Sequence, residues 1–334
     1  MKVSVIGAGS WGSAFAIHLA RKNIETHLWI REQDIYEQVC QIRENKTFLP
    51  GFLFPPNVCF HHDLEQALRD TSIIFIAIPS KFCRSIYRTI SPLLKPEQML
   101  VSLTKGIEEK SLKRMSEVHQ ELCPHHPEMM FAALSGPSFA KEVVQLHPTA
   151  VVVASMNLEA GKKIQKIVSS LSFRAYTSKD LIGVELAGAL KNVIAIAAGI
   201  SCGLEFGSNP VAALITRGLV EIMRLGHHLG AKQSTFSGLA GIGDLVLTCT
   251  GGLSRNRHVG YELGKGKNLD EILSKTQMVA EGIITTLSTY NLSQREGVEM
   301  PICDEVYQII YKEKDPRKAI QDLMSRELKD EDVL

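Results

Sequence analysis

The chain has 334 residues, of which 45% are hydrophobic and 22% are charged, values typical of a globular protein with room for two domains. Its 37 lysines and arginines nearly balance 36 aspartates and glutamates. This balance argues against a nucleic-acid partner, because proteins that coat nucleic acid carry a strong basic excess. The longest apolar run, residues 186–204, contains Lys191, Asn192 and three glycines, so we expect no stable membrane insertion.

The cysteines and the N-terminus indicate the compartment. The chain begins directly with a strand pattern at residues 2–6 and lacks the features of a signal peptide. Seven scattered cysteines never form a C-x-x-C pair, so neither a disulfide framework nor a structural zinc site is expected. Cys123, His125 and His126 lack zinc-site spacing and a second ligand pair. We expect free thiols in a reducing cytoplasm, and no metal.

Short β-rich runs alternate with helical patterns in the first half. The run at residues 73–78 is continuously apolar, as in a strand buried on both faces of a parallel sheet. The alternation predicts an open parallel α/β sheet with helices on both faces. We expect strands at residues 3–6, 26–30, 73–78, 99–103, 129–134 and 150–154. We expect helices at residues 10–21, 63–69, 81–94, 110–122 and 158–170.

The strand pattern stops after about residue 178, and the second half predicts an all-helical domain. We expect helices at residues 178–201, 210–230, 270–275, 282–296 and 304–311. Residues 238–257, which are rich in glycine, are interpreted as a loop. The sequence therefore predicts two domains, residues 1–180 and 181–334.

A glycine-rich turn, G-x-G-x-x-G, follows the first strand and opens the first helix. In this context Gly7 permits the tight turn, Gly9 lets the backbone approach a pyrophosphate, and Gly12 lets the helix pack closely on the strand. The helix N-terminus, at Ser10 and Trp11, offers N–H groups to phosphate. The motif predicts a Rossmann-type dinucleotide-binding domain over residues 1–180. Trp11 either covers the pyrophosphate or packs in the core.

Arg31 ends the second strand, next to Glu32. An acidic residue near this position holds the adenosine ribose, whereas an arginine accommodates a 2′-phosphate. A guanidinium also stacks on adenine and pairs with phosphate. Arg31 therefore favours NADP, with NAD also accepted. The alternative is an ordinary solvated charge at a strand end.

Lys191 is the only charged residue between residues 186 and 204. A helix that is apolar all round is buried, and a buried lysine is costly unless it is paired, lines a wet cleft or loses its proton. Desolvation lowers the pKa of a lysine, which suits a general acid or base near neutral pH. The alternative is a lysine that extends to the surface.

Polar residues in the glycine-rich segment indicate an anion site. Ser254, Arg255 and Asn256 offer hydrogen-bond donors, as a small phosphate or carboxylate requires. Asp244 is positioned in sequence to orient Lys191 and to tune its charge. Lys105, Gly136 and Ser138 follow predicted strands, where ligands of open α/β sheets bind. Glu281 lies at a predicted helix start, where it either contacts the ligand or only stabilises the helix dipole.

Taken together, these motifs resemble the bacterial type of NAD(P)-dependent glycerol-3-phosphate dehydrogenase. The resemblance implies a Rossmann-type domain followed by a helical domain similar to that of 6-phosphogluconate dehydrogenase. The matching segments are residues 5–14, 78–80, 103–108, 134–140, 185–199, 238–245, 247–250 and 254–256.

The resemblance implies the reversible reduction of dihydroxyacetone phosphate to sn-glycerol 3-phosphate by NADPH or NADH, which supplies the glycerophospholipid backbone. It implies that Lys191 is the proton donor and acceptor. The implied substrate contacts are Lys105, Gly136, Ser138, Lys191, Asp244, Ser254, Arg255 and Asn256. The implied cofactor contacts are Gly7, Gly9, Ser10, Trp11, Gly12, Arg31, Lys105, Ala140, Arg255, Val279 and Glu281. The apolar helical half also suggests a homodimer.

Two other interpretations stay open. A 2-hydroxy-acid or ketopantoate reductase shares the first 30 residues of the pattern but has no reason to carry Ser254, Arg255 and Asn256 after Asp244. A nicotinamide-sensing protein without turnover needs the glycine turn but not Lys191 in an apolar helix.

Overall fold

The structure, a computed structural model, describes residues 1–274, 280–328 and 330–331. The chain forms two compact units: residues 1–104 with 115–181, and residues 105–114 with 182–334. The expected division placed all of residues 1–180 in one domain, whereas segment 105–114 belongs to the helical unit. Its Ile107 is 1% exposed in the core of that unit, and Ser288 Oγ donates a hydrogen bond to the Ile107 carbonyl oxygen at 3.3 Å.

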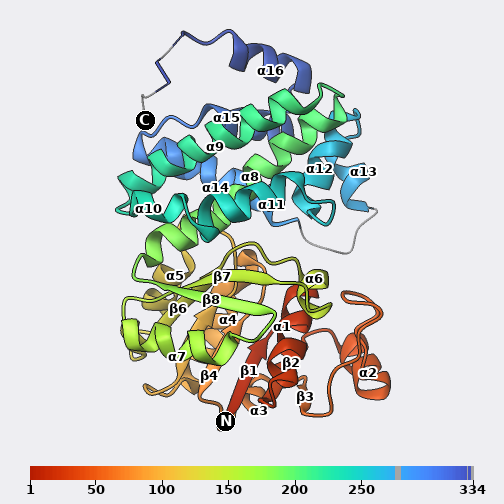
Figure 1. Cartoon of the computed structure of the whole chain (residues 1–334), viewed down its shortest axis with the longest axis vertical. Helices are drawn as coiled ribbons and strands as arrows, with labels where there is room; N and C mark the ends of the chain where they lie inside the picture. Colours follow the sequence, from red (N-terminus) through yellow and green to blue (C-terminus); the bar gives the residue numbers. More distant parts are fainter. Residues whose placement is uncertain (275–279, 329, 332–334) are drawn as a thin grey trace. The chain divides into compact units, whose positions relative to one another are not determined.

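The first unit is built on a sheet whose strand order is β3-β2-β1-β4-β5-β6-β7-β8 across the described residues. Its strands form a twisted layer with helices in front and behind (Figure 1). The strands are β1 (Lys2–Ile6), β2 (Glu25–Trp29), β3 (Val58–His61), β4 (Ile73–Ile76), β5 (Met99–Ser102), β6 (Phe131–Ser135), β7 (Thr149–Ala154) and β8 (Phe173–Ser178). The helices are α1 (Ser10–Arg21), α2 (Gln33–Ile42), α3 (Leu64–Leu68), α4 (Ser80–Ile90), α5 (Met115–Leu122), α6 (Ala140–Val144) and α7 (Leu158–Val168).

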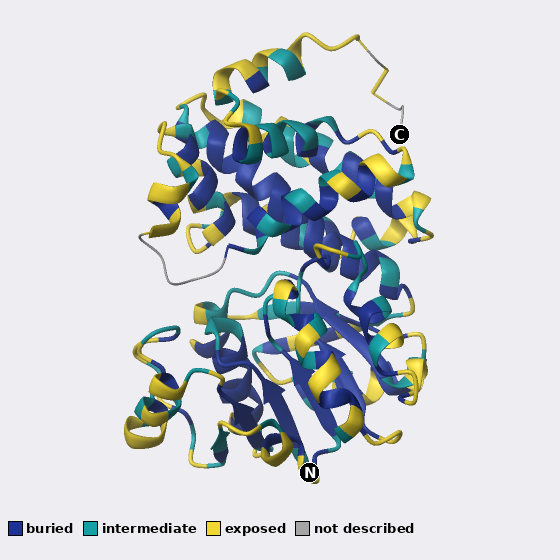
Figure 2. Ribbon diagram, turned by 180° about the vertical axis from the view of Figure 1, so that it is seen from behind, coloured by how far each residue is buried: buried dark blue, intermediate teal, exposed yellow. Residues whose placement is uncertain are grey.

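The central strands are buried on both faces, as the apolar run had predicted. All four residues of β4 are fully buried, and the central strands of this unit are dark in Figure 2. Strands β3, β2, β1, β4, β5 and β6 pair in parallel. The sheet is parallel, as expected, except at one pair, because β7 runs antiparallel to β6. Between them the chain forms only the five-residue α6, which packs on α1 and does not cross the sheet.

The second unit is helical. Its helices are α8 (Leu181–Gly203), α9 (Ser208–His228), α10 (Gln233–Phe236), α11 (Asp244–Thr250), α12 (Arg255–Gly264), α13 (Leu269–Ser274), α14 (Glu281–Glu296), α15 (Pro301–Lys312) and α16 (Pro316–Met324). The interpretation of residues 238–257 as a loop was wrong: after an irregular turn at Leu239–Gly243, this segment forms α11 and the start of α12. Ser254 caps α12, since its Oγ accepts a hydrogen bond from the Arg257 N–H at 3.2 Å.

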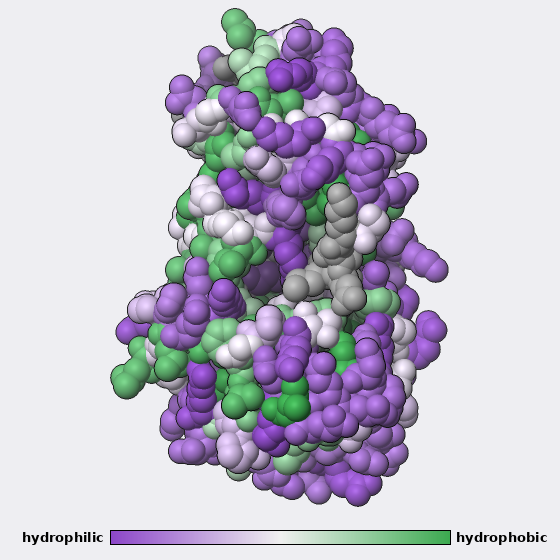
Figure 3. All heavy atoms as spheres, turned by 90° about the vertical axis from the view of Figure 1, so that its right-hand side faces the viewer, coloured by the Kyte–Doolittle hydropathy of each residue, from purple (hydrophilic) through white to green (hydrophobic). Residues whose placement is uncertain are grey.

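Helix α8 is the core of the helical unit. It is the one straight helix in the described part of the chain that is long and apolar enough to cross a membrane, yet 94% of its most apolar window is buried inside the protein. The face of the protein in Figure 3 is mainly hydrophilic. The apolar sequence of α8 is therefore explained by protein packing and implies no membrane span.

Helices α8 and α12 cross in direct backbone contact. A Cβ atom on Gly199 would lie 2.1 Å from the Arg257 carbonyl oxygen, and a Cβ atom on Gly260 would lie 2.0 Å from the Ile196 carbonyl oxygen. Gly203 and Gly264 repeat this contact one turn further along each helix. These glycines thus fix the position of α12, and with it Arg255 and Asn256, against the helix that carries Lys191.

Gly260→Ala tests this crossing. We expect the free energy of unfolding to fall by about 1–3 kcal/mol, because the new methyl group meets backbone and not a flexible side chain. This loss outweighs the gain in helix propensity of about 1 kcal/mol. The matched control is Gly252→Ala, whose Cβ has no neighbour within 4 Å and no left-handed φ. Denaturant unfolding of the control is expected to change by less than about 0.5 kcal/mol. Equal effects of the two substitutions would contradict the close contact.

Candidate active site

The glycine turn in the first unit has the tight geometry that the motif predicts. Gly7 has φ +111°, and a Cβ there would lie 2.6 Å from the Ala77 carbonyl oxygen. A Cβ on Gly12 would lie 1.9 Å from the Gly7 carbonyl oxygen. Gly9 caps α1 and has no atom within 4 Å of its Cβ position. A side chain at Gly7 or Gly12 would therefore clash with backbone, whereas Gly9 leaves open space beside the helix N-terminus.

The N-terminus of α1 fits a bound pyrophosphate. Its first turn contains no acidic residue, and Gly9 leaves open space beside it. Ser10 lies at this terminus, but its hydroxyl donates a hydrogen bond to the Phe48 carbonyl oxygen at 2.6 Å. Trp11 packs on Phe15, with ring centroids 5.5 Å apart, and its buried indole N–H has no partner among the described residues. Trp11 thus packs on the core and also keeps a donor.

Arg31 follows β2 at the same edge of the sheet as the glycine turn. Its guanidinium lies 4.7 Å from the centroid of the Phe82 ring, and its Nε donates a hydrogen bond to Glu32 Oε1 at 2.9 Å. Its side chain is 53% exposed. Arg31 is therefore a half-exposed cation held between an aromatic ring and a carboxylate, available for a ligand phosphate.

Gly136 and Ser138 lie between the end of β6 and the start of α6. The Ser138 hydroxyl donates a hydrogen bond to the Gly136 carbonyl oxygen at 2.8 Å. Ala140 is the first residue of α6. Since β6 is parallel to β5 and β1 to β4, this turn lies at the carboxyl edge that also carries the glycine turn.

Lys191 is buried in the helical unit and is not a surface lysine. Its residue exposure is 6%, and its Nζ forms an ion pair with Asp244 Oδ1. Nζ also donates a hydrogen bond to Thr248 Oγ1 at 2.8 Å. The Thr248 hydroxyl in turn donates to the Asp244 carbonyl oxygen at 2.6 Å. The second oxygen of Asp244 accepts from Lys105 Nζ at 2.7 Å.

Two ammonium groups thus share one buried carboxylate. Burial lowers the pKa of Lys191 to about 7, and the neighbouring Lys105 charge adds to this effect, although Asp244 opposes it. Burial by itself would raise the pKa of Asp244, but Lys105 and Lys191 outweigh it and hold that pKa below its usual value. The cluster therefore keeps an ionised carboxylate beside a lysine that can gain or lose a proton near neutral pH.

Side-chain amides connect this cluster to α12. Asn192 Nδ2 donates to the Lys105 carbonyl oxygen at 3.3 Å, and Asn256 Nδ2 donates to Asn192 Oδ1 at 2.8 Å. Asn256 Oδ1 accepts from the Gly282 N–H at 2.9 Å. The Asn256 amide thus joins α8, α12 and α14, and its second N–H remains for a ligand.

Arg255 begins α12, and Glu281 begins α14. Burial lowers the pKa of Arg255, whereas the charge of Glu281 opposes that shift. The first turn of α12 contains no acidic residue, so its N-terminus and the guanidinium both favour an anion. Ser254 serves here as the helix cap. Val279, predicted as a cofactor contact, lies outside the described residues.

The helical unit therefore brings together several predicted residues that are distant in sequence: Lys105, Lys191, Asp244 and Asn256. Sequence reasoning missed Thr248 and the bridging role of Asn192. Thr248 follows Asp244 by four residues, and this spacing puts both side chains on one face of a helix. The spacing was not informative at the level of sequence, because the segment was interpreted as a loop.

Known proteins match the chain over nearly its whole length. Residues 2–161 match the family described as NAD-dependent glycerol-3-phosphate dehydrogenase N-terminus, and residues 180–321 match its C-terminus. The chain is 50% identical to glycerol-3-phosphate dehydrogenase [NAD(P)+] of Geobacter sp. (strain M21), covering 99% of both chains. It is 47% identical to the enzyme of the same name from Syntrophobacter fumaroxidans, covering 98% of this chain and 97% of that one.

Solved structures extend the likeness to the fold. A glycerol-3-phosphate dehydrogenase from Coxiella burnetii superimposes with a TM-score of 0.94 at 39% identity, covering 97% of this chain and 99% of that one. A ketopantoate reductase from Ralstonia eutropha shares only the fold, with a TM-score of 0.62 at 15% identity over 96% of this chain and all of that one. Matches to both halves of the chain, together with close relatives over its whole length, show that it belongs to the NAD(P)-dependent glycerol-3-phosphate dehydrogenase family.

Proposed function

We propose that this enzyme reversibly reduces dihydroxyacetone phosphate to sn-glycerol 3-phosphate with NADPH or NADH. The observation that carries the proposal is the buried cluster in which Lys191 and Lys105 share Asp244. Such a cluster suits proton transfer to and from a carbonyl oxygen. It does not suit a nicotinamide sensor without turnover, which has no use for a buried lysine of lowered pKa.

The first unit is proposed to bind the dinucleotide, which supplies the hydride for C2 of the substrate when bound. Gly7, Gly9 and Gly12 shape the turn, and the first N–H groups of α1 at Ser10 and Trp11 face the pyrophosphate. Ala140, Val279 and Glu281 are carried over as further contacts from the family resemblance alone. Arg31 is proposed to hold the adenosine end, and its pairing with Glu32 fits a site that accepts both NADP and NAD.

Lys191 is proposed to transfer the proton. An ammonium group has three N–H bonds, of which Asp244 and Thr248 accept two. The third is left for the C2 oxygen of the substrate. During reduction the ammonium donates its proton to the developing alkoxide, and during oxidation the neutral amine accepts the proton of the hydroxyl group. Asp244 and Lys105 orient this group and set the local field.

The substrate phosphate is proposed to bind at the start of α12. Arg255, the remaining N–H of Asn256 and the helix N-terminus supply donors and positive charge there. The hydrogen bond from Asn256 to Asn192, the residue that follows Lys191 on α8, supports an anion site close to Lys191. Ser254 holds the turn as a cap and can donate its own hydroxyl proton. Gly136 and Ser138 are carried over as further substrate contacts from the family resemblance alone.

The cellular setting is also a proposal. All seven cysteines are free, which fits a reducing cytoplasm. The product would supply the backbone of glycerophospholipids. Apolar residues on α9 are only partly buried in the single chain, which supports a homodimer formed through this helix: Val211, Leu214, Ile215 and Leu219.

Lys191→Ala is expected to lower kcat for dihydroxyacetone phosphate reduction by about 10²–10⁴-fold, the usual range for a lost general acid. Loss of nicotinamide absorbance measures the rate, and fluorescence of bound NADPH checks that the cofactor still binds. Lys163→Ala, at an exposed lysine of α7, is the control and should retain full activity. A Lys191→Ala enzyme within about threefold of the wild type would contradict the assigned role.

The pH dependence should have opposite signs in the two directions. The pKa of Lys191 is lowered to about 7, so the ammonium needed for reduction is lost as pH rises through 7, and kcat/KM for reduction should fall. The neutral amine needed for oxidation appears over the same interval, so kcat/KM for oxidation should rise. Steady-state rates between about pH 5 and pH 9, roughly two units either side of the pKa, measure both. Parallel profiles in the two directions would contradict the mechanism.

Arg31→Gln tests cofactor choice. Removing one charge-assisted contact to the 2′-phosphate should raise the KM for NADPH by about 10–100-fold. The KM for NADH, which lacks that phosphate, should change by less than about threefold. The two KM values are measured on the same preparation, so NADH serves as the internal control. Equal changes for both cofactors would show that Arg31 is only a solvated charge.

A further inference from the structure

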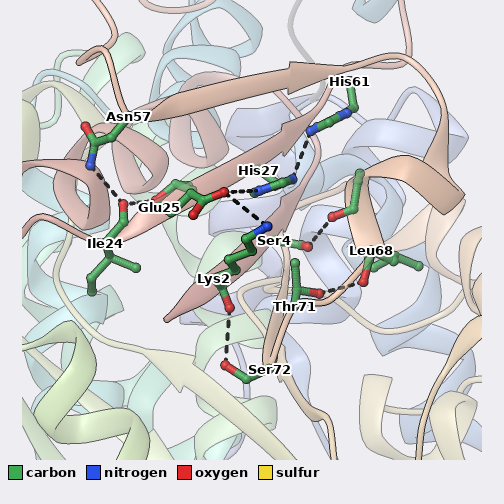
Figure 4. Close-up of polar contacts among 12 residues, drawn as sticks. Lys2, Ser4, Ile24, Glu25, His27, Asn57, His61, Leu68, Thr71 and Ser72 are labelled. Atoms are coloured by element: carbon green, nitrogen blue, oxygen red, sulfur yellow. Dashed lines mark hydrogen bonds and ion pairs between the residues drawn. The ribbon is translucent and has the colours of Figure 1, made fainter.

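Strands β2 and β3 bring a second group of reactive side chains together in the first unit. His27 and Cys59 are direct partners in the parallel register of these strands, and Glu25 lies two residues before His27 on the same face. In Figure 4 the Glu25 carboxylate points toward the His27 ring, and His61 approaches that ring from the other side. None of these residues takes part in the proposed reaction.

The three side chains are already close enough to share one ion. The ligand atoms of Glu25, His27 and Cys59 all lie within 4.8 Å of one another, and Glu25 Oε1 lies 3.1 Å from His27 Nε2. Ligand atoms in a tetrahedral zinc site lie about 3.3–3.8 Å apart, given bonds of about 2.0–2.3 Å. Side-chain movements of about 1 Å would therefore bring the three ligand atoms to the spacing of a tetrahedral zinc site. The backbone need not move, because the two strands are already paired.

The charge and ligand types select the ion. A thiolate and a carboxylate contribute two negative charges, and the imidazole is neutral, so a dication makes the group neutral. Sulfur and nitrogen ligands favour Zn²⁺ over Mg²⁺ or Ca²⁺, which prefer oxygen alone. Three protein ligands leave the fourth position of a tetrahedral ion to water.

The surroundings support the ligands without closing the site. His61 Nε2 lies 2.9 Å from His27 Nδ1, so His27 can bind a metal through Nε2 and donate its Nδ1 proton to His61. Lys2 Nζ lies 3.5 Å from Glu25 Oε1 in this structure, but both side chains are more than 40% exposed, so the lysine can turn to solvent. An ion can therefore reach the three ligands from solvent past the exposed Glu25 side chain.

We propose that Glu25, His27 and Cys59 form a binding site for Zn²⁺. The site lies in the amino-terminal part of β2, whereas the glycine turn and Arg31 follow the carboxyl ends of their strands, so it is separate from the proposed dinucleotide site. It is also the metal site that sequence spacing did not reveal, since Glu25 and Cys59 are far apart in the chain.

The experiment titrates the reduced, chelator-treated full-length enzyme with Co²⁺, a spectroscopic substitute for Zn²⁺. We expect one equivalent per chain, with a thiolate-to-cobalt charge-transfer band that Zn²⁺ abolishes by displacement. Cys59→Ser should remove the band, and Glu25→Gln, at an exposed side chain, should weaken Co²⁺ binding by about tenfold or more. Cys40→Ser, at an exposed cysteine of α2, is the matched control and should keep band and affinity.

Basal reductase activity of the metal-free variants checks that each has folded, because none of these residues belongs to the proposed catalytic site. The proposal is overturned if the wild type shows no stoichiometric band, or if the band survives Cys59→Ser. It is also overturned if Glu25→Gln binds Co²⁺ as tightly as the wild type does.

Discussion

The helical unit is organised around one buried carboxylate that two lysines share. Asp244 is 1% exposed and Lys191 is 6% exposed, so neither charge is stabilised by water and each depends on the other. Because Asp244 stays ionised while burial lowers the pKa of Lys191, the pair holds a transferable proton at a fixed place. Removing the carboxylate would leave the buried Lys191 ammonium and the partly buried Lys105 ammonium together without a counter-charge. The pair therefore depends on the packing that holds segment 105–114, α8 and α11 together.

Contacts elsewhere in the helical unit hold these segments in place around Asp244. Glycines at the crossing of α8 and α12 let the two backbones touch, and the Asn192–Asn256 hydrogen bond sets the rotation of α12 about the contact. Thr248 then fixes the direction of the Lys191 ammonium from within α11. A mutation at the glycine crossing is therefore expected to reach the chemistry through geometry, even though no glycine there touches the lysine.

Local signals in the sequence predicted the glycine turn of the first unit and the buried lysine of the helical unit. The turn from Gly7 to Gly12 could be predicted because its whole motif lies within six residues directly after a predicted strand. Lys191 could be predicted because it is a single charge in an apolar helix. Helix α11 and the start of α12 could not, since α11 lies between glycines at 238, 241 and 243 on one side and 251 and 252 on the other, and these resemble loop residues in the sequence. The sequence also could not predict that segment 105–114 belongs to the helical unit, or that Glu25 lies close to Cys59. Both depend on contacts between distant parts of the chain.

The mechanism requires that Lys191 exchange its proton near neutral pH, and titration of that one side chain measures this exchange. Enzyme containing lysine labelled with ¹³C at Cε would be followed by NMR across pH, with Lys191→Arg identifying the resonance. We expect a transition near pH 7, where the pKa of Lys191 lies, far below the value of about 10.4 for a lysine in water. A Lys191 resonance that titrates together with the exposed lysines would contradict it.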